Sequence, residues 1–336
     1  MTIAPVEFPI SIAGTGDYVP SRRMESREFD QRWGKPAGWT EERTGITCRY
    51  FASSEETSSF MGAEAARAAL KAAGIAAREL DCIVFTACVS EQAIPCTAVL
   101  IHRRLGLEGT GIPAFDVNAT CLGFMMAFDM MADAIATGRY RRVLIVSSEV
   151  ASVGLNWEDT ETAPLFGDGA AAVVLEGNRE GGSVLLARHA QTFSEGADLC
   201  QVRSGGTRIS VREHLQRYLE GACFEMSGRE TYRLAAQVLP QFLRSLLTRA
   251  RVEVPNIACW IPHQASSKAL AHLQATLALP AERVTRILHE RGNQIAASLP
   301  ATLHHAVASG RVQRGDLVAL VGAGAGLSLG GAILRY

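Results

Sequence analysis

Short apolar runs alternate along this chain with longer segments in which apolar residues recur every three or four positions. The first pattern predicts buried strands, and the second predicts helices that turn one face to a core. In the first half, the patterns predict strands over residues 8–13, 81–87, 112–117 and 142–147, and helices over 59–73, 95–105 and 122–136. Residues 166–176 are expected to form a glycine turn that runs into a strand. In the second half, the patterns predict helices over 228–250, 267–278 and 295–309, and strands over 257–262, 317–322 and 330–335.

The order of these elements indicates the fold class. Strands that alternate with helices are typical of an α/β protein with largely parallel sheets. Both halves show this order, so we expect an internal duplication, with one half at residues 1–178 and the other at 179–336. Residues 14–20 are expected to form a turn, residues 21–46 a solvated helix and loop, and residues 181–221 an irregular stretch.

The most apolar predicted helix, at residues 122–136, directly follows a cysteine. Only Asp129 and Asp133 are charged in it, and a helix that is apolar on nearly every side is expected to be buried. Gly138 can end this helix, and the arginines after it suit the negative end of the helix dipole. Cys121 therefore lies at the positive end of a buried helix, which favours the reactive thiolate. We take Cys121 as a candidate nucleophile.

Composition narrows the class of protein. The chain has 336 residues, 48% of them hydrophobic and 20% charged, which suffices for a large core. A net charge of −1 argues against a nucleic-acid partner held by bulk charge. No apolar run approaches the roughly 20 residues of a membrane span, and the N-terminal residues do not resemble a signal peptide. The eight cysteines are scattered without metal-site spacing, so we expect free thiols in the cytoplasm, no metal and no redox cofactor.

Two further polar residues stand at the ends of predicted strands or before predicted helices. His263 directly follows the strand at 257–262, and Asn293 precedes the helix at 295–309. Ligands of parallel α/β sheets collect at the carboxyl ends of strands, so Cys121 and His263 could share one crevice. A thiolate attacks a thioester carbonyl well, and His and Asn can donate to a developing anionic oxygen. Taken singly, the cysteine could be an inert core residue, the histidine structural, and the asparagine a turn or helix cap.

The motifs around these residues resemble β-ketoacyl-acyl-carrier-protein synthase III of the thiolase superfamily. The resemblance covers essentially the whole chain and is carried by NATCLGF around Cys121, PHQAS around His263, GNQIAAS around Asn293, GWTEERTGI, LFGDGAAAVVL and the terminal DLVALVGAGAGLSLGGAILRY. It implies a thiolase-like five-layer αβαβα fold built from two duplicated halves, usually as a homodimer. It also implies a cytoplasmic enzyme of fatty-acid or related metabolism that uses acyl-CoA or acyl-ACP together with malonyl-ACP or malonyl-CoA.

Carried over to this chain, the resemblance gives each residue a role. Cys121 would accept an acyl group, while His263 and Asn293 would stabilise the enolate formed when the malonyl group loses carbon dioxide. The backbone N–H groups of Cys121 and Ala325 match the family's oxyanion hole. A Cys/His/Asn set, in place of Cys/His/His, indicates the branch that condenses starter groups rather than the one that elongates chains.

Other matches concern substrate binding, and some depart from the family. Trp39 and Arg43 match positions that hold the nucleotide part of coenzyme A, and Lys268 matches a basic residue that docks the carrier protein. The arginine expected to face Trp39 across the adenine is Thr160 here. Further departures are Ser266 for asparagine, Gln294-Ile295 for Thr-Ser, and Ala325 for glycine. These changes favour a carrier protein as acyl donor and a pocket of altered shape.

Alternatives remain open at this level. An acyltransferase of specialised metabolism would move the acyl group from Cys121 to a hydroxyl or amine. A related branch condenses two thioesters without decarboxylation, but Ile94 replaces its glutamate base, and the nearby Glu91 is a loop carboxylate. The arginine-rich residues 201–217 could form a solvated surface or bind the carboxylate of a diacid starter. A silent partner subunit would usually lack the cysteine.

Overall fold

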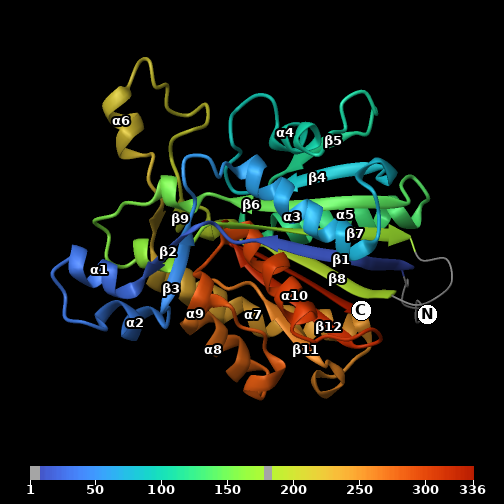
Figure 1. The fold of residues 1–336 in the computed structure, drawn as a ribbon. Helices are drawn as coiled ribbons and strands as arrows, with labels where there is room; N and C mark the ends of the chain where they lie inside the picture. The colour runs from blue at the N-terminus through green and yellow to red at the C-terminus, as the bar shows by residue number, and fades with distance from the viewer. Residues whose placement is uncertain (1–7, 178–183) are drawn as a thin grey trace.

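Two sheets lie between layers of helices (Figure 1). The computed structural model describes residues 8–177 and 184–336 of the chain. The first sheet has the strand order β1 (Ile10–Tyr18), β7 (Gly169–Gly177), β6 (Arg142–Glu149), β4 (Cys82–Thr86) and β5 (Ala114–Val117). The second has the order β11 (Cys259–Pro262), β12 (Leu317–Gly324), β13 (Ser328–Arg335) and β8 (Val184–Thr192).

The helices form three layers around these sheets. The central helices α5 (Gly123–Ala136) and α10 (Ser298–Ala308) contact strands of both sheets. The outer face of the first sheet is covered by α3 (Ser58–Ala73) and α4 (Thr97–Arg104). The outer face of the second sheet is covered by α7 (Gly228–Ala250) and α8 (Ser267–Thr276). The order helix, sheet, helix, sheet, helix is the five-layer arrangement expected from the sequence.

The two halves share one topology. In each sheet, an outer strand pairs antiparallel with a second, the second pairs antiparallel with a third, and the third pairs parallel with a fourth. These strands are β1, β7, β6 and β4 in the first half. They are β8, β13, β12 and β11 in the second half. The matching order and directions reveal the duplication that weak sequence identity hides, while the proposed boundary at residues 178 and 179 involves residues outside the described ranges.

Short elements lie at one end of the layers. The first half contributes β2 (Arg22–Glu25), α1 (Ser26–Arg32), α2 (Trp39–Thr44) and β3 (Cys48–Phe51). The second half contributes β9 (Cys200–Gln201), α6 (Leu215–Glu220), β10 (Glu225–Met226) and α9 (Leu288–Arg291). Figure 1 shows α6 at the tip of a protruding segment, while α1 and α2 pack beside β2 and β3. The segment at 21–46 is thus more ordered than the solvated helix and loop predicted for it.

The first strand is longer than the sequence suggests. Residues 14–20 were expected to form a turn, but β1 continues through Tyr18. Its glycines permit close packing against α3: a Cβ on Gly16 would lie 2.4 Å from the Ala69 nitrogen, and one on Gly14 would lie 2.4 Å from the Ala69 oxygen. Glycine within a strand marks such a close approach as well as a turn.

Three other expectations are wrong. The sheets are mixed rather than largely parallel, because β1, β7, β13 and β8 pair antiparallel. Residues 184–192, expected to be irregular, form β8, which pairs with the last strand of the chain. The stretch from 181 to 183 lies outside the described residues. Finally, α5 is not buried on all sides, since Met130 is 47% exposed and Asp129 and Asp133 pair with Arg188.

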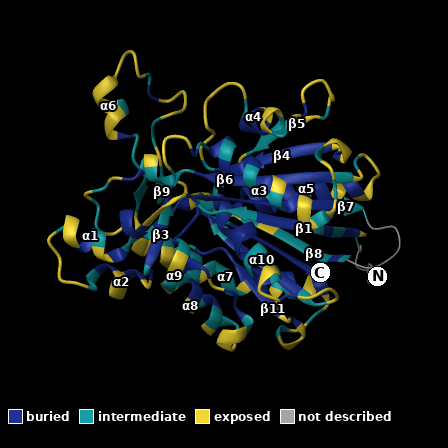
Figure 2. Cartoon of the chain, viewed as in Figure 1, coloured by how far each residue is buried: buried dark blue, intermediate teal, exposed yellow. Residues whose placement is uncertain are grey.

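The buried residues follow the layers (Figure 2). The largest cluster joins α5, β6 and β7 of the first half to β11, β12 and α10 of the second. Gly138 has a φ of 75° and ends α5 as predicted. Within the described ranges, no helix is both long enough and apolar enough to cross a membrane.

The central position of α5 predicts its share of the stability. The Phe128 side chain is 1% exposed, so Phe128→Ala should lower the free energy of unfolding by about 3–5 kcal/mol in denaturant titrations. Met130→Ala on the same helix should change it by about 0.5 kcal/mol, because exposed positions rarely matter more. Equal losses for both variants would contradict the packing described for α5.

Candidate active site

The candidate nucleophile lies in a tight turn between β5 and α5. A 3₁₀ turn, η2 (Thr120–Leu122), holds Cys121 directly before Gly123 begins the helix. Asn118 braces this turn, because its Oδ1 accepts a hydrogen bond from the Thr120 N–H at 2.9 Å and its Nδ2 donates to the Cys88 oxygen at 3.2 Å. Thr120 has a φ of 52°, a costly conformation for a β-branched residue, which indicates that the surroundings fix the turn.

Hydrogen bonds around the Cys121 sulfur favour the thiolate. A hydrogen bond from Cys88 has the largest effect in lowering the pKa of Cys121 well below its usual value. Burial opposes this shift, while a hydrogen bond and electrostatic attraction from His263 and a backbone hydrogen bond from Ala325 reinforce it. A hydrogen bond lowers the pKa of a thiol when it is donated to the thiolate. We therefore assign the backbone contact of Ala325 to its N–H group, which donates to the Cys121 sulfur.

Cys88 takes the opposite role in this pair of thiols. Its hydrogen bond to Cys121, then burial, and then the negative charge of Cys121 raise the pKa of Cys88. Cys121 alone has the imidazole and the Ala325 N–H beside it, so it ionises first. Cys88 therefore remains a thiol, and its S–H donates a hydrogen bond to the Cys121 thiolate.

His263 reaches this site from the second sheet. It directly follows β11 and is 6% exposed. Its backbone N–H donates to the Val321 backbone oxygen at 2.8 Å. Close packing needs a glycine in β12, because a Cβ on Gly322 would lie 3.3 Å from the His263 Cβ and 2.9 Å from Leu122. Within the described part of the chain, His263 Nδ1 is buried without a hydrogen-bond partner, so this nitrogen can bind a substrate or a water.

Asn293 lies beside the segment that follows His263. Its side chain is 7% exposed, its Nδ2 donates to the Ala265 oxygen at 3.3 Å, and its Oδ1 accepts from the Ile295 N–H at 2.9 Å. The next turn, η8 (Ile295–Ala297), packs against η2, which carries Cys121. The structure thus brings Cys121 into contact with His263 and Ala325, and joins Asn293 to the His263 segment.

The residues matched to coenzyme A and carrier-protein binding lie on two adjoining helices. Trp39 begins α2 and is half-buried, with the Arg43 guanidinium 4.7 Å and the Lys35 ammonium 5.2 Å from its ring centre. Lys268 is exposed in the first turn of α8. The two helices touch where the Ser267 hydroxyl donates to the Thr44 oxygen at 2.6 Å.

The positions that depart from the family pattern have local structural roles. The Ser266 hydroxyl caps α8 by accepting from the Ala269 N–H at 3.2 Å. Gln294 is 1% exposed, and its Nε2 donates to the Asp168 oxygen at 3.0 Å. Ile94 is 86% exposed in the loop before α4. Glu91 accepts a hydrogen bond from the Ser59 N–H at 2.5 Å, so its carboxylate is engaged at the start of α3.

Two site residues were missed by the sequence reasoning. Cys88 follows β4 and Glu149 ends β6, the two strands beside the Cys121 turn. Their signal was available in the sequence, because each is a titratable residue at the carboxyl end of a buried strand. No role is assigned to either residue in the sequence analysis.

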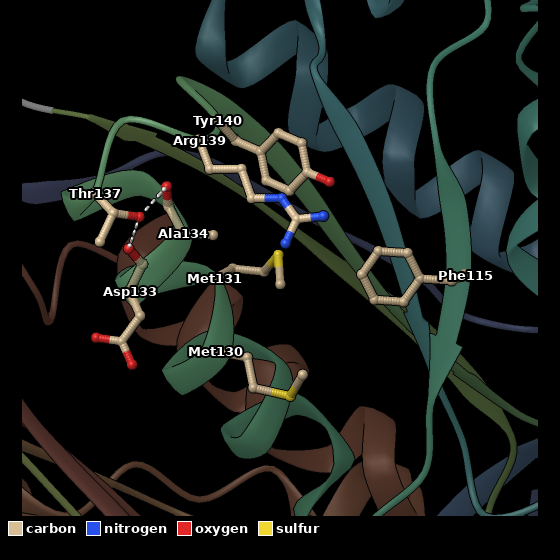
Figure 3. Close-up of a pocket in the computed structure, with 8 residues that line it drawn as sticks. All are labelled: Phe115, Met130, Met131, Asp133, Ala134, Thr137, Arg139 and Tyr140. Atoms are coloured by element: carbon tan, nitrogen blue, oxygen red, sulfur yellow. Dashed lines mark hydrogen bonds between the residues drawn. The ribbon is translucent and has the colours of Figure 1, made fainter.

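One cavity among the described residues lies away from this site. A pocket of about 310 Å³ lies at the far end of α5, where Met130, Met131 and Phe115 face it together with Arg139 and Tyr140 (Figure 3). A helix rises about 1.5 Å per residue, so Met130 starts more than about 10 Å along the helix from Cys121. We therefore do not assign this pocket to the reacting groups. The described residues also contain no cluster of three or more side chains suited to a metal ion.

Comparisons with known proteins cover nearly the whole chain. Residues 115–194 match the family model described as 3-oxoacyl-[acyl-carrier-protein (ACP)] synthase III, and residues 247–336 match the model of its C-terminal part. The β-ketoacyl-[acyl-carrier-protein] synthase III of Methylococcus capsulatus is 34% identical over 325 residues, which make up 97% of this chain and 98% of the relative.

Solved structures agree with these matches. The crystal structure of 3-oxoacyl-[acyl-carrier-protein] synthase III from Aquifex aeolicus has a TM-score of 0.88 and 32% identity, over 97% of this chain and 100% of that one. The priming β-ketosynthase of the R1128 polyketide biosynthetic pathway has a TM-score of 0.88 and 29% identity, over 99% of this chain and 98% of that one.

The environment of Cys121 predicts the pH dependence of its reactivity. Cys121 should react with iodoacetamide faster than Cys200, whose pKa burial raises, and its rate should fall only as the pH drops through its lowered pKa. His263→Ala should move the midpoint of that profile upward, because the hydrogen bond and the electrostatic attraction from His263 that lower the pKa of Cys121 are lost. Mass spectrometry of modified peptides over a pH series measures both rates.

The control for this experiment is His102→Ala in α4, which should leave the midpoint in place. An unchanged midpoint in His263→Ala, or labelling of Cys200 ahead of Cys121, would show that the sulfur is not the stabilised thiolate described above.

Proposed function

Because the chain belongs to the family of β-ketoacyl-[acyl-carrier-protein] synthase III enzymes and is a condensing acyltransferase, we propose that it joins an acyl group held on Cys121 to a malonyl thioester. One observation carries this assignment. The Cys121 sulfur accepts hydrogen bonds from Cys88, His263 and the Ala325 backbone, which favour its thiolate form. In this proposal, residues 1–178 supply the nucleophile, and residues 179–336 supply the histidine and the asparagine.

Loading is the first step. The Cys121 thiolate attacks the carbonyl carbon of an acyl thioester, the new C–S bond forms, and the donor's thiolate leaves and takes a proton. The anionic oxygen that develops would lie against the N–H groups of Cys121 and Ala325. Donors of this kind are worth about 3–4 kcal/mol each in kcat.

Condensation follows on the acylated enzyme. The malonyl thioester loses carbon dioxide, and the electron pair of the broken C–C bond forms an enolate on the thioester. We propose that His263 and the Asn293 amide donate hydrogen bonds to this enolate oxygen. Acylation of Cys121 frees the His263 N–H that hydrogen-bonds the thiolate, and the Asn293 Nδ2 has a second hydrogen to donate. The carbanion then attacks the acyl carbonyl and displaces the Cys121 thiolate.

The surface around α2 and α8 is our proposed docking area for the substrate carriers, acyl-CoA or acyl-ACP and malonyl-ACP or malonyl-CoA. Trp39 and Arg43 would hold the nucleotide part of coenzyme A, and Lys268 would bind an acidic group of the carrier protein. Lys35 and Arg43 both lie near the Trp39 ring, and Thr160 supplies no second planar group, which supports a carrier protein as the preferred acyl donor. The nucleotide of coenzyme A and the carrier protein would compete for binding to this surface.

We also propose that the chain acts in the cytoplasm as a homodimer. All eight cysteines are free, as in a reducing compartment. β5 ends the five-stranded sheet and its residues are half-buried, so its outer edge offers backbone groups to a second copy. Neither a nucleic acid nor a membrane is needed in this proposal.

A labelled substrate tests the condensation. With an acyl donor and malonyl-ACP labelled at the free carboxyl, the native enzyme should release labelled carbon dioxide and form a β-ketoacyl thioester. Cys121→Ala should form no acyl-enzyme and no β-ketoacyl product, since the acceptor atom is gone. His263→Ala should still load Cys121 but lose decarboxylation by a factor of about 10² or more, as expected for an electrostatic contributor. An acyl-enzyme that acylates hydroxyls or amines without releasing carbon dioxide would overturn the proposal in favour of simple acyl transfer.

The docking role of Lys268 has its own test. Lys268→Glu should raise the KM for malonyl-ACP about tenfold and leave kcat nearly unchanged, because the reversed charge acts on binding rather than on the reacting atoms. Lys71→Glu, at an exposed position of α3, is the matched control and should change neither constant. A KM that stays constant in Lys268→Glu and at higher salt would place carrier docking elsewhere.

A further inference from the structure

Glu149 is a buried carboxyl group for which the proposed reaction has no role. It is the last residue of β6 and is 3% exposed. Thr86 of β4 pairs with Ser147 of β6, so Cys88 and Glu149 continue that register two residues farther on. The carboxyl group thus lies beside Cys88, whose thiol hydrogen-bonds to Cys121. A carboxyl group is costly to bury unless hydrogen bonds hold it, so its contacts deserve a functional interpretation.

Two backbone groups from different halves of the chain bind this carboxyl group. Glu149 Oε1 accepts a hydrogen bond from the Cys88 N–H at 2.6 Å and another from the Ala296 N–H at 3.3 Å. Ala296 belongs to η8, the turn that begins two residues after Asn293. One oxygen therefore links the Cys88 segment, which contacts Cys121, to the segment that carries Asn293.

We propose that Glu149 is a positioning residue for condensation, whose neutral carboxyl group ties the Cys88 segment to the Asn293 segment beside the Cys121 sulfur. The inference rests on the proposed condensation, because it concerns the step in which the Cys121 thiolate is expelled. It assigns Glu149 no contact with substrate.

The charges around Glu149 support its neutral form. The titratable groups that face it are Cys88 from the segment after β4, Cys121 from η2 and Asp168 from the segment before β7. Burial raises the pKa of Glu149 to about 8, and the charges of Cys121 and Asp168 add to this shift. The hydrogen bonds from the Cys88 and Ala296 backbones act in the opposite direction. At neutral pH the site therefore carries the charge of Cys121 beside a protonated Glu149.

This arrangement affects the two half-reactions differently. Loading converts the Cys121 thiolate into a neutral thioester, so an ionised Glu149 would not hinder it. Condensation regenerates the thiolate when the tetrahedral intermediate collapses, and a carboxylate nearby would repel the sulfur as its negative charge returns. We therefore expect condensation, and not loading, to slow at alkaline pH as Glu149 loses its proton to the solvent. In the acylated enzyme this pKa lies below about 8, because the charge of Cys121, which helps to raise it, is gone.

Single-turnover rates over a pH series test the inference. Acyl-Cys121 formation and β-ketoacyl release are followed separately by quenched-flow mass spectrometry between about pH 6 and 9.5. In the native enzyme, condensation should decline with one ionisation whose midpoint lies below about pH 8, while loading stays level. Glu149→Gln keeps an acceptor for both backbone N–H groups but cannot ionise, so its condensation should show no such decline. Glu149→Asp, which can still ionise, should restore the decline.

Asp168→Asn is the matched control, because Asp168 is also buried but binds Ala52 and Ser152 instead of the Cys88 segment. It should keep a decline, moved toward lower pH because the charge of Asp168 no longer helps to raise the pKa of Glu149. A decline that persists unchanged in Glu149→Gln, or one that affects loading equally in the native enzyme, overturns the inference. The test of loading against condensation uses the native enzyme alone. The inference can therefore be refuted even if the Glu149→Gln variant does not fold. Failure to load Cys121 or to release carbon dioxide in the native enzyme would instead refute the proposed function.

Stability gives an independent readout of the same group. A carboxyl group whose pKa is raised from 4.5 to about 8 on folding stabilises the fold fully below pH 4.5, and this contribution is lost as the pH rises toward 8. The melting temperature of Glu149→Gln, relative to that of the native chain, should therefore increase between about pH 5 and 8. A constant difference would show that Glu149 does not hold a proton in the folded state.

Discussion

A thiolate inside a protein must be surrounded by donors, because burying an unpaired charge is costly. That requirement shapes this chain. The first half supplies Cys121 and the Cys88 thiol, and the second half supplies His263 and the Ala325 N–H. The duplicated sheets make this meeting possible, since β4, β5 and β11 all end near the same place, with α5 and α10 between the sheets. Glycine at position 322 then allows the second sheet to approach the Cys121 turn.

Periodicity predicted the elements whose pattern is unambiguous. The predicted helix at 228–250 coincides with α7, and the strand at 142–147 forms most of β6, because continuous apolar patterns leave few alternatives. Prediction failed where glycine allows either a turn or close packing, and where a strand depends on a distant pairing partner. Glycines 14 and 16 looked like a turn but leave room for α3, and β8 is a half-exposed strand whose pairing with β13 depends on contacts distant in sequence. Strand direction also depends on such contacts.

The candidate site shows the same division. Local motifs pointed to Cys121, His263 and Asn293, because each stands at the end of a strand or the start of a helix in an otherwise apolar or glycine-rich setting. Cys88 and Glu149 lack such a setting. Their importance arises from the register between β4 and β6, which places them beside the Cys121 turn and which no single segment specifies.

The order of the contributing residues along the chain has a consequence during translation. The ribosome makes Cys121 long before His263 and Ala325, the groups that with Cys88 lower its pKa. Until those later residues have folded into place, the sulfur of the nascent chain lacks two of the three hydrogen bonds that lower its pKa. Its full capacity to attack cellular thioesters or electrophiles thus arises only with the folding of the second sheet, whose strands β11 and β12 are made after Cys121.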